Sequence, residues 1–153
     1  MRQAVPADAA AVAALVDVAY RHYVPRIGMT PGPMTADYEE VVRSHVVIVA
    51  ERDGGVAGVI VLRVTDEGFL IDNVAVHPAH QGGGLGRALL SLAEDRAQDA
   101  GFGSIHLYTH EMMTENLALY SRIGYAEYRR EVRDGFSLVY MRKHLPEPAA
   151  GRT

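Results

Sequence analysis

The spacing of apolar residues predicts that the first part of the chain is helical. Asp8 is a suitable N-cap, and it precedes a stripe of apolar residues with helical spacing at Val12, Leu15, Val16 and Ala19. We therefore expect an amphipathic helix from Ala9 to Tyr23. Prolines and glycines interrupt residues 25–33, so a long loop is expected there, followed by a short helix from Thr35 to Ser44.

From Val46 onward the pattern changes to short β-rich runs. Val46–Ala50, Ala57–Val64 and Phe69–His77 are separated by two Asp/Gly turns, which predicts an antiparallel meander. A glycine cluster then leads into a second helical stripe that ends at Gly101. The residues of this helical stripe are Leu85, Ala88, Leu89, Leu92, Ala93 and Arg96.

The last third of the chain predicts a strand, a helix and a hairpin. The strand is expected at Ser104–Thr109, the helix at Thr114–Arg122, and the hairpin at Tyr125–Val132 and Phe136–Arg142. A strand, a helix and a further strand in this order predict a right-handed crossover and a locally parallel pair. The chain is therefore expected to be a single α/β domain over residues 1–145 with one mixed sheet, and residues 146–153 are expected to form a flexible tail.

Composition and charge exclude several classes of function. The net charge of -4 has the wrong sign for a protein held on nucleic acid by phosphate neutralisation. The absence of cysteine excludes disulfides, thiolate zinc sites and cysteine nucleophiles, and the histidine pairs lack zinc-site spacing, so we expect no metal. Asp8 and Asp17 argue against a signal peptide, and the longest apolar run, Val56–Leu62, is too short to span a bilayer. We expect a cytoplasmic protein with no membrane partner.

Four glycines lie where a strand passes into a helix, within Gln81-Gly82-Gly83-Gly84-Leu85-Gly86. The first N–H groups of a helix have no intrahelical partner, and missing side chains let an anion approach the main chain. A phosphorylated ligand is the interpretation that we favour, although glycines can also serve a tight turn alone. A Walker loop is excluded because no Gly-Lys pair exists. A dinucleotide fingerprint also fails, because its third glycine would fall on Arg87 or Leu89.

The glycine segment resembles the Q/R-x-x-G-x-G/A loop that binds the acyl-CoA pyrophosphate in the GNAT (GCN5-related N-acetyltransferase) superfamily. The likeness extends to the preceding Val74-Ala75-Val76-His77-Pro78 and to the later segment from Asn116 to Tyr125. It implies a GNAT-like fold with a mixed, mostly antiparallel sheet, one parallel, splayed strand pair and about four flanking helices. Gly83 departs from the family pattern, because such loops often carry a cation there.

The resemblance also implies the residues that bind acetyl-CoA as cosubstrate. Main-chain groups of the strand are expected to hold the pantetheine and the acetyl carbonyl, and amides of the turn the pyrophosphate. The implied cofactor-binding residues are Val74, Ala75, Val76, Gln81, Gly82, Gly83, Gly84, Leu85, Gly86, Arg87 and Asn116.

Acetyl transfer to an amine requires a group that accepts a proton from the nucleophile and a group that protonates the thiolate. Tyr120 is the candidate acid, because a phenol with a pKa of about 10 stays protonated at neutral pH. Asp72 is the candidate base; the alternative is a carboxylate that is paired with an arginine or bonded to main chain. Glu111 is the reserve candidate. The residues expected in the acceptor pocket are Tyr20, Tyr23, Arg26, Tyr38 and Glu111, each of which could instead pack a lid or face solvent.

These assignments predict an N-acetyltransferase that transfers acetyl directly from acetyl-CoA to a primary amine of a small-molecule or amino-acid-like acceptor. The alternatives are acetylation of a protein N-terminus or lysine, and a CoA-binding module that has lost turnover. Exposed edges in the final hairpin also suggest a homodimer.

Overall fold

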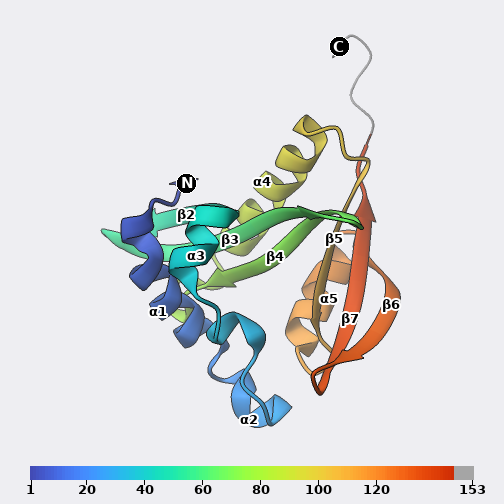
Figure 1. Cartoon of the computed structure of the whole chain (residues 1–153), viewed down its shortest axis with the longest axis horizontal. Coiled ribbons are helices and arrows are strands. Elements are labelled where there is room, and N and C mark those ends of the chain that lie inside the picture. The colour runs from blue at the N-terminus through green and yellow to red at the C-terminus, as the bar shows by residue number, and fades with distance from the viewer. Residues whose placement is uncertain (147–153) are drawn as a thin grey trace. The chain divides into compact units, whose positions relative to one another are not determined.

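The computed structural model describes residues 1–146. Its strands are β1 (Arg2–Gln3), β2 (Val46–Arg52), β3 (Gly55–Thr65), β4 (Gly68–Val76), β5 (Ser104–His110), β6 (Ala126–Arg133) and β7 (Phe136–His144). Its helices are α1 (Ala9–Tyr20), α2 (Tyr23–Ile27), α3 (Tyr38–Ser44), α4 (Leu85–Asp99) and α5 (Thr114–Arg122). Among these residues the strands form one sheet in the order β1-β2-β3-β4-β5-β7-β6 (Figure 1).

The sheet is mixed, as the sequence predicts. β4 and β5 run parallel, with Phe69, Leu70 and Ile71 opposite Ile105, His106 and Leu107. The pairs β1–β2, β2–β3, β5–β7 and β6–β7 are antiparallel. The α/β prediction is therefore confirmed, with α1, α3, α4 and α5 as the main helices. The short strand β1 was not predicted, because two residues are too few for a periodic signal.

Packing divides the described residues into two compact units. The first unit contains Met1–Arg63 and Asp72–Ser91, and the second contains Val64–Ile71 and the chain from Leu92 onward. The single domain over residues 1–145 stays a prediction. Pro146, the first residue of the predicted tail, accepts a hydrogen bond of 2.8 Å from Gln98 Nε2, and residues 147–153 lie outside the described residues.

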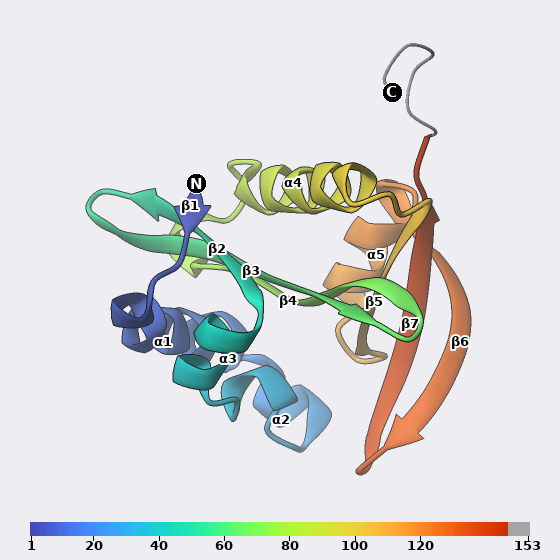
Figure 2. The same ribbon diagram turned by 45° about the horizontal axis from the view of Figure 1, so that its top comes forward.

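In the first unit, helices cover both faces of the sheet formed by β2 and β3. α1 and α3 lie on one face, and the first turns of α4 lie on the other (Figure 2). The core between these layers contains fully buried side chains such as Val12, Val49 and Leu89. A Cβ added at Gly58 would lie 3.0 Å from Leu89 Cδ1, so the close approach of α4 to β3 depends on glycine at this position.

The boundaries of the first helices differ from the prediction. α1 ends at Tyr20, and α2 begins at Tyr23, where Pro25 fits because the first turn of a helix needs no N–H donor. The predicted loop thus contains a short helix. α3 begins at Tyr38 rather than at Thr35, because the Asp37 carboxylate caps it by accepting from the N–H of Glu39 at 3.1 Å.

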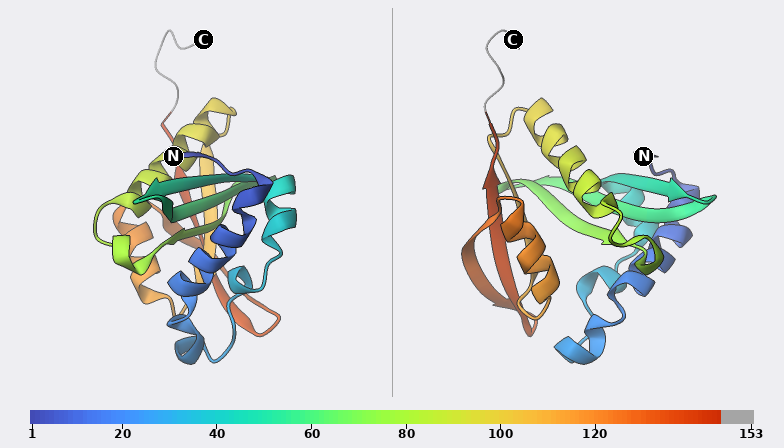
Figure 3. Two further views of the ribbon diagram at one scale, coloured as in Figure 1. Left: turned by 90° about the vertical axis from the view of Figure 1, so that its left-hand side faces the viewer. Right: turned by 180° about the vertical axis from the view of Figure 1, so that it is seen from behind.

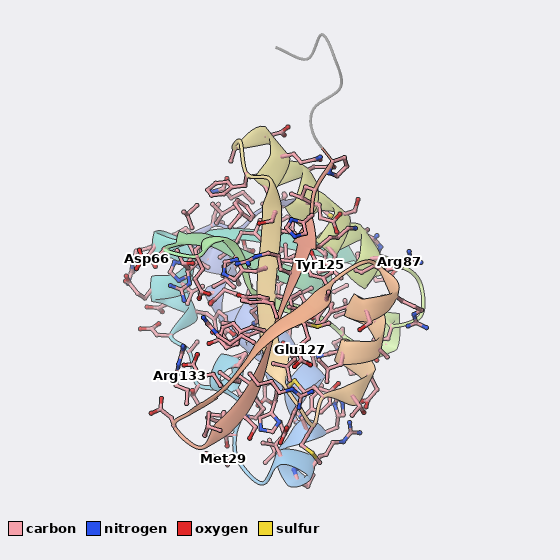
Figure 4. All side chains as sticks on the ribbon, turned by 90° about the vertical axis from the view of Figure 1, so that its right-hand side faces the viewer. Met29, Asp66, Arg87, Tyr125, Glu127 and Arg133 are labelled. Atoms are coloured by element: carbon pink, nitrogen blue, oxygen red, sulfur yellow. The ribbon has the colours of Figure 1, made fainter. Side chains whose placement is uncertain are left out.

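In the second unit, β5, β7 and β6 form an antiparallel layer with α5 alongside (Figure 3). The strand β6 is outermost, and its register shifts between Glu127 and Arg129. Exposed ion pairs on it join Arg130 to Glu127 at 2.9 Å and Arg133 to Glu131 at 3.0 Å; Glu127 and Arg133 are labelled in Figure 4. Charged side chains discourage pairing between sheet edges, and the homodimer stays a prediction.

Candidate active site

The strand β4 ends at Val76 in a turn with several internal hydrogen bonds. His77 Nδ1 accepts from the N–H of Ala79 at 3.0 Å, and Gln81 Nε2 donates to the Val76 carbonyl at 3.2 Å. Gly82 and Gly84 then have φ values of 86° and 84°, in the left-handed region that side chains avoid. The path of the main chain between β4 and α4 therefore requires glycine at positions 82 and 84.

The main-chain N–H groups of residues 82–87 have no acceptor within the described part of the chain. Ala88 is the first residue of α4 whose N–H is bonded, to the Gly84 carbonyl at 3.0 Å. Within residues 1–146, no atom accepts a hydrogen bond from the N–H groups of residues 82–87. A Cβ added at Gly82 or Gly84 would meet nothing within 4 Å, so this surface is open. Such a set of donors at the start of a helix is suited to an anion.

Arg87 adds a positive charge to the first turn of α4. Its side chain is exposed and lies at the edge of the molecule in Figure 4. It makes no ion pair or hydrogen bond with any residue in the described range. A guanidinium can bind phosphate oxygens through two N–H groups at once. The turn and Arg87 together present donors that are suited to phosphate oxygens.

A buried hydrogen-bond network centred on Asn73 fixes the strand that leads to this turn. The Tyr20 hydroxyl donates to Asn73 Oδ1 at 2.7 Å and lies 3.1 Å from the Val74 carbonyl oxygen. Asn73 Nδ2 donates to the Tyr38 hydroxyl at 3.1 Å, and Tyr38 donates to the Pro33 carbonyl at 2.6 Å. The network ties α1, α3 and the loop between α2 and α3 to β4.

The orientation of the Asn73 amide follows from the number of available protons. Tyr38 has a single hydroxyl proton and donates it to Pro33, so its oxygen can only accept from Asn73. The amide nitrogen therefore faces Tyr38, and the amide oxygen faces Tyr20. Burial raises the pKa of Tyr38, which keeps this hydroxyl protonated at neutral pH.

Asp72 lies beside this network and forms an ion pair. Asp72 Oδ1 is 3.3 Å from Arg63 Nε, and 24% of the Asp72 side chain is exposed. The buried polar residue of this strand is the neighbouring Asn73, which is 7% exposed. The arginine partner that we considered as the alternative is present. A partly exposed carboxylate with a single contact is open to a further partner, and the role as base stays a prediction.

The helix α5 carries Asn116 and Tyr120, which lie one helical turn apart. Tyr120 is buried with 6% of its surface exposed, and its carbonyl accepts from the N–H of Tyr125 at 2.9 Å. Asn116 is half-buried, and its Nδ2 lies 3.7 Å from the Met113 sulfur. The second unit thus presents both residues on the same helix, as the sequence predicts, and their roles stay predictions.

Tyr125 contributes a polar atom without a partner. Its hydroxyl is buried and forms no hydrogen bond with any residue in the described part of the chain. Burial raises the pKa of Tyr125, so the hydroxyl stays neutral. The rings of Tyr120 and Tyr125 are 5.9 Å apart.

The remaining residues predicted for the acceptor pocket have local contacts. Tyr23 is buried, and the exposed Arg26 guanidinium lies 5.2 Å from the centre of its ring. Glu111 is exposed and lies 3.4 Å from Arg130. In the first unit Tyr20 and Tyr38 meet at Asn73, and Asp72, the residue before Asn73, pairs with Arg63. Sequence reasoning did not identify Asn73 or Arg63, although an asparagine inside an apolar strand was a visible signal.

Two further features concern metal ions and membranes. Within residues 1–146, no three histidine or acidic side chains gather in a way that could hold a metal ion. Over the same residues, no helix combines the length and apolar character that a membrane span requires.

Comparison with known proteins gives consistent matches. Residues 43–127 match the family of acetyltransferase (GNAT) domains. IAA acetyltransferase of Azospirillum brasilense is 34% identical over 82 residues, which cover 52% of this chain and 54% of that protein. Mycothiol acetyltransferase of Jonesia denitrificans is 33% identical over 90 residues, which cover 58% of this chain and 29% of that protein. The matches therefore span about half or less of the length of these curated relatives.

A solved structure resembles nearly the whole chain. The yncA protein of Salmonella typhimurium, solved with its cofactor acetyl-CoA, is 28% identical with a TM-score of 0.70. The match covers 97% of this chain and 95% of that one.

The Asn73 network predicts a large effect on stability. Asn73→Ala removes two buried hydrogen bonds and leaves a cavity, and we expect a loss of about 2–4 kcal/mol in the free energy of unfolding. Urea denaturation followed by circular dichroism measures this loss. Asn116→Ala, at the half-buried asparagine of α5, is the matched control and is expected to cost less. Equal losses in the two variants would show that the network does not stabilise the fold.

The unpaired hydroxyl of Tyr125 predicts that a substitution there stabilises the protein, in contrast to the one at Asn73. Tyr125→Phe removes a buried polar atom without a partner, and we expect the free energy of unfolding to rise by about 1 kcal/mol. Tyr140→Phe is the control, because the Tyr140 hydroxyl accepts from Arg133 at 2.9 Å and its removal is expected to destabilise the protein. Thermal and urea unfolding of both variants compare the two effects. A loss of stability in Tyr125→Phe contradicts the assignment.

Proposed function

Because the chain belongs to the family of GNAT acetyltransferase domains, we propose that it transfers the acetyl group of acetyl-CoA directly to a primary amine of a small acceptor. The observation that carries the proposal is the set of open N–H groups at residues 82–87. The names of the two curated relatives, IAA acetyltransferase and mycothiol acetyltransferase, support an acceptor of low molecular weight.

The first unit supplies the groups that bind the cosubstrate. Acetyl-CoA brings an activated acetyl group and an anionic diphosphate. The N–H groups of residues 82–87 and the Arg87 guanidinium bind the diphosphate. The main chain of Val74–Val76 binds the pantetheine arm. The absence of side chains at Gly82 and Gly84 keeps the approach to the main chain open.

Proton transfer is assigned to Asp72 and Tyr120. An alkylamine with a pKa near 10.4 is protonated at pH 7, and releasing its proton costs about 4.6 kcal/mol. Asp72 accepts this proton directly or through water, and its partly exposed carboxylate is accessible to solvent. Tyr120 donates its phenolic proton to the departing thiolate. Glu111 is the weaker candidate for the base, because it is exposed and its carboxylate lies beside Arg130.

The glycine turn predicts a specific loss of cosubstrate binding. Gly84→Ala places a side chain at a left-handed φ of 84°, so the turn must change its path and its N–H groups move. Losing one hydrogen bond to a charged group weakens binding about tenfold or more. Isothermal titration calorimetry with acetyl-CoA measures the change in Kd.

A matched glycine separates this effect from general strain. Gly101 has a φ of 88°, and a Cβ added there also meets nothing within 4 Å. Gly101→Ala is expected to destabilise the fold by a similar amount, about 1–2 kcal/mol, while leaving the Kd for acetyl-CoA unchanged. If both variants bind acetyl-CoA with the same affinity, the turn is not the diphosphate site.

Catalysis by Tyr120 is tested in a thiol-release assay. Wild-type protein is screened with acetyl-CoA against amines, polyamines, amino acids and short peptides. For the best acceptor, Tyr120→Phe is expected to lower kcat about 10²- to 10⁴-fold, the usual contribution of a general acid, with nearly unchanged acetyl-CoA affinity. An unchanged kcat removes the role from Tyr120. If only peptides are acetylated, the acceptor is a protein rather than a small molecule. If no acceptor is acetylated, the proposed function is rejected.

A further inference from the structure

The ion pair between Arg63 and Asp72 is loosely made and accessible. It consists of one contact of 3.3 Å between Arg63 Nε and Asp72 Oδ1. The two side chains are 42% and 24% exposed. Pairs with this exposure contribute little to stability, because water screens the charges and each long side chain loses freedom. Stabilisation of the fold therefore does not account for the presence of this ion pair.

Both side chains keep unused hydrogen-bonding atoms. Within residues 1–146, the Arg63 Nη1 and Nη2 atoms donate to no residue, and Asp72 Oδ2 accepts from none. A guanidinium offers five N–H donors, and a carboxylate offers about four acceptor positions. Most of this capacity remains available to a ligand that carries both a positive and a negative group.

The Asn73 network holds one side of the pair in place. Asp72 precedes Asn73, whose amide is held by Tyr20 at 2.7 Å and by Tyr38 at 3.1 Å. Because these contacts are buried, the main chain at Asp72 has little freedom to shift. Arg63 lies on the neighbouring strand β3 with a longer and more exposed side chain, so it can adapt to a ligand.

We propose that Arg63 and Asp72 together recognise the zwitterionic group of an α-amino acid, which is the acceptor of the reaction. The proposal rests on the proposed function and specifies its substrate class. The ammonium group of the acceptor binds Asp72 Oδ2, and its carboxylate binds the Nη1 and Nη2 atoms of Arg63. A single molecule then offers an opposite charge to each half of the ion pair, whereas a carboxamide or a simple amine has no carboxylate for the Nη1 and Nη2 atoms of Arg63.

This arrangement also completes the proton balance of the transfer. The ammonium loses one proton to Asp72, and its nitrogen forms a bond with the acetyl carbon while the carbon–sulfur bond breaks. Tyr120 protonates the sulfur. The nitrogen, which becomes positively charged on attack, loses a second proton, so the products are the N-acetyl amino acid and the free thiol. One proton is released to solvent for each acetyl group transferred, and Tyr120 regains the other.

The test compares matched acceptors in the thiol-release assay. A panel of amino acids is measured beside the carboxamide and the decarboxylated amine of each member. For the preferred side chain, wild-type kcat/KM for the amino acid is expected to exceed that for the amine about 10- to 100-fold, the usual effect of a charge-assisted contact. In Arg63→Gln this ratio is expected to fall to near one. Arg63→Lys keeps the charge and is expected to give an intermediate ratio.

Arg52→Gln is the matched control, because Arg52 is an exposed arginine at the end of β2 in the same unit. This variant is expected to keep the wild-type ratio. The proposal is overturned if wild-type protein turns over the amine as well as the amino acid, or if Arg63→Gln keeps the wild-type ratio. In either case turnover of any amine leaves the proposed function intact, so the two failures are distinguishable.

Equilibrium binding gives a second readout that does not depend on turnover. Calorimetry with CoA-loaded protein is expected to show binding of the preferred amino acid that weakens at least tenfold in Arg63→Gln. The affinity of the variant for acetyl-CoA is measured in the same series to show that the fold is intact. Equal affinity of wild type and variant for the amino acid contradicts the proposal.

Discussion

The fixed main chain at the end of β4 is the constraint on which the candidate site depends. The Asn73 amide has one allowed orientation, because Tyr38 donates its only proton to Pro33. The network includes the Tyr20 hydroxyl, which lies 3.1 Å from the Val74 carbonyl oxygen, and Asp72 directly precedes Asn73 in the strand. The same strand then passes directly into the glycine turn. A shift of β4 would therefore move both the candidate base and the donors proposed for the diphosphate.

The site contains two kinds of polar group: some have their hydrogen-bond partners within the protein, and others have none among the described residues. The buried groups around Asn73 are satisfied by one another, which makes this part of the first unit rigid. The N–H groups of residues 82–87 and the side chain of Arg87 are unsatisfied within the described protein and face the outside. Rigid support next to open donors is the arrangement expected of a preorganised anion site, because binding then requires little reordering.

The sequence predicted the parts of the fold that depend on local patterns. The meander, the glycine turn and the final hairpin follow from alternation and from turn residues. The buried face of α4 was less predictable, since Ala88 and Arg96 of the expected stripe are exposed while Leu90 and Ala97 are buried. Asn73 and Arg63 were missed because their roles come from partners distant in sequence, such as Tyr20, which lies 53 residues before Asn73.

Nuclear magnetic resonance of ¹⁵N-labelled protein tests the central claim most directly. Titration with coenzyme A is compared with titration by pantetheine, which lacks the diphosphate. The structure predicts that the amide signals of residues 82–87 move with coenzyme A and stay in place with pantetheine, whereas those of Val74–Val76 respond to both. Unchanged signals at residues 82–87 in the presence of saturating coenzyme A would contradict the account.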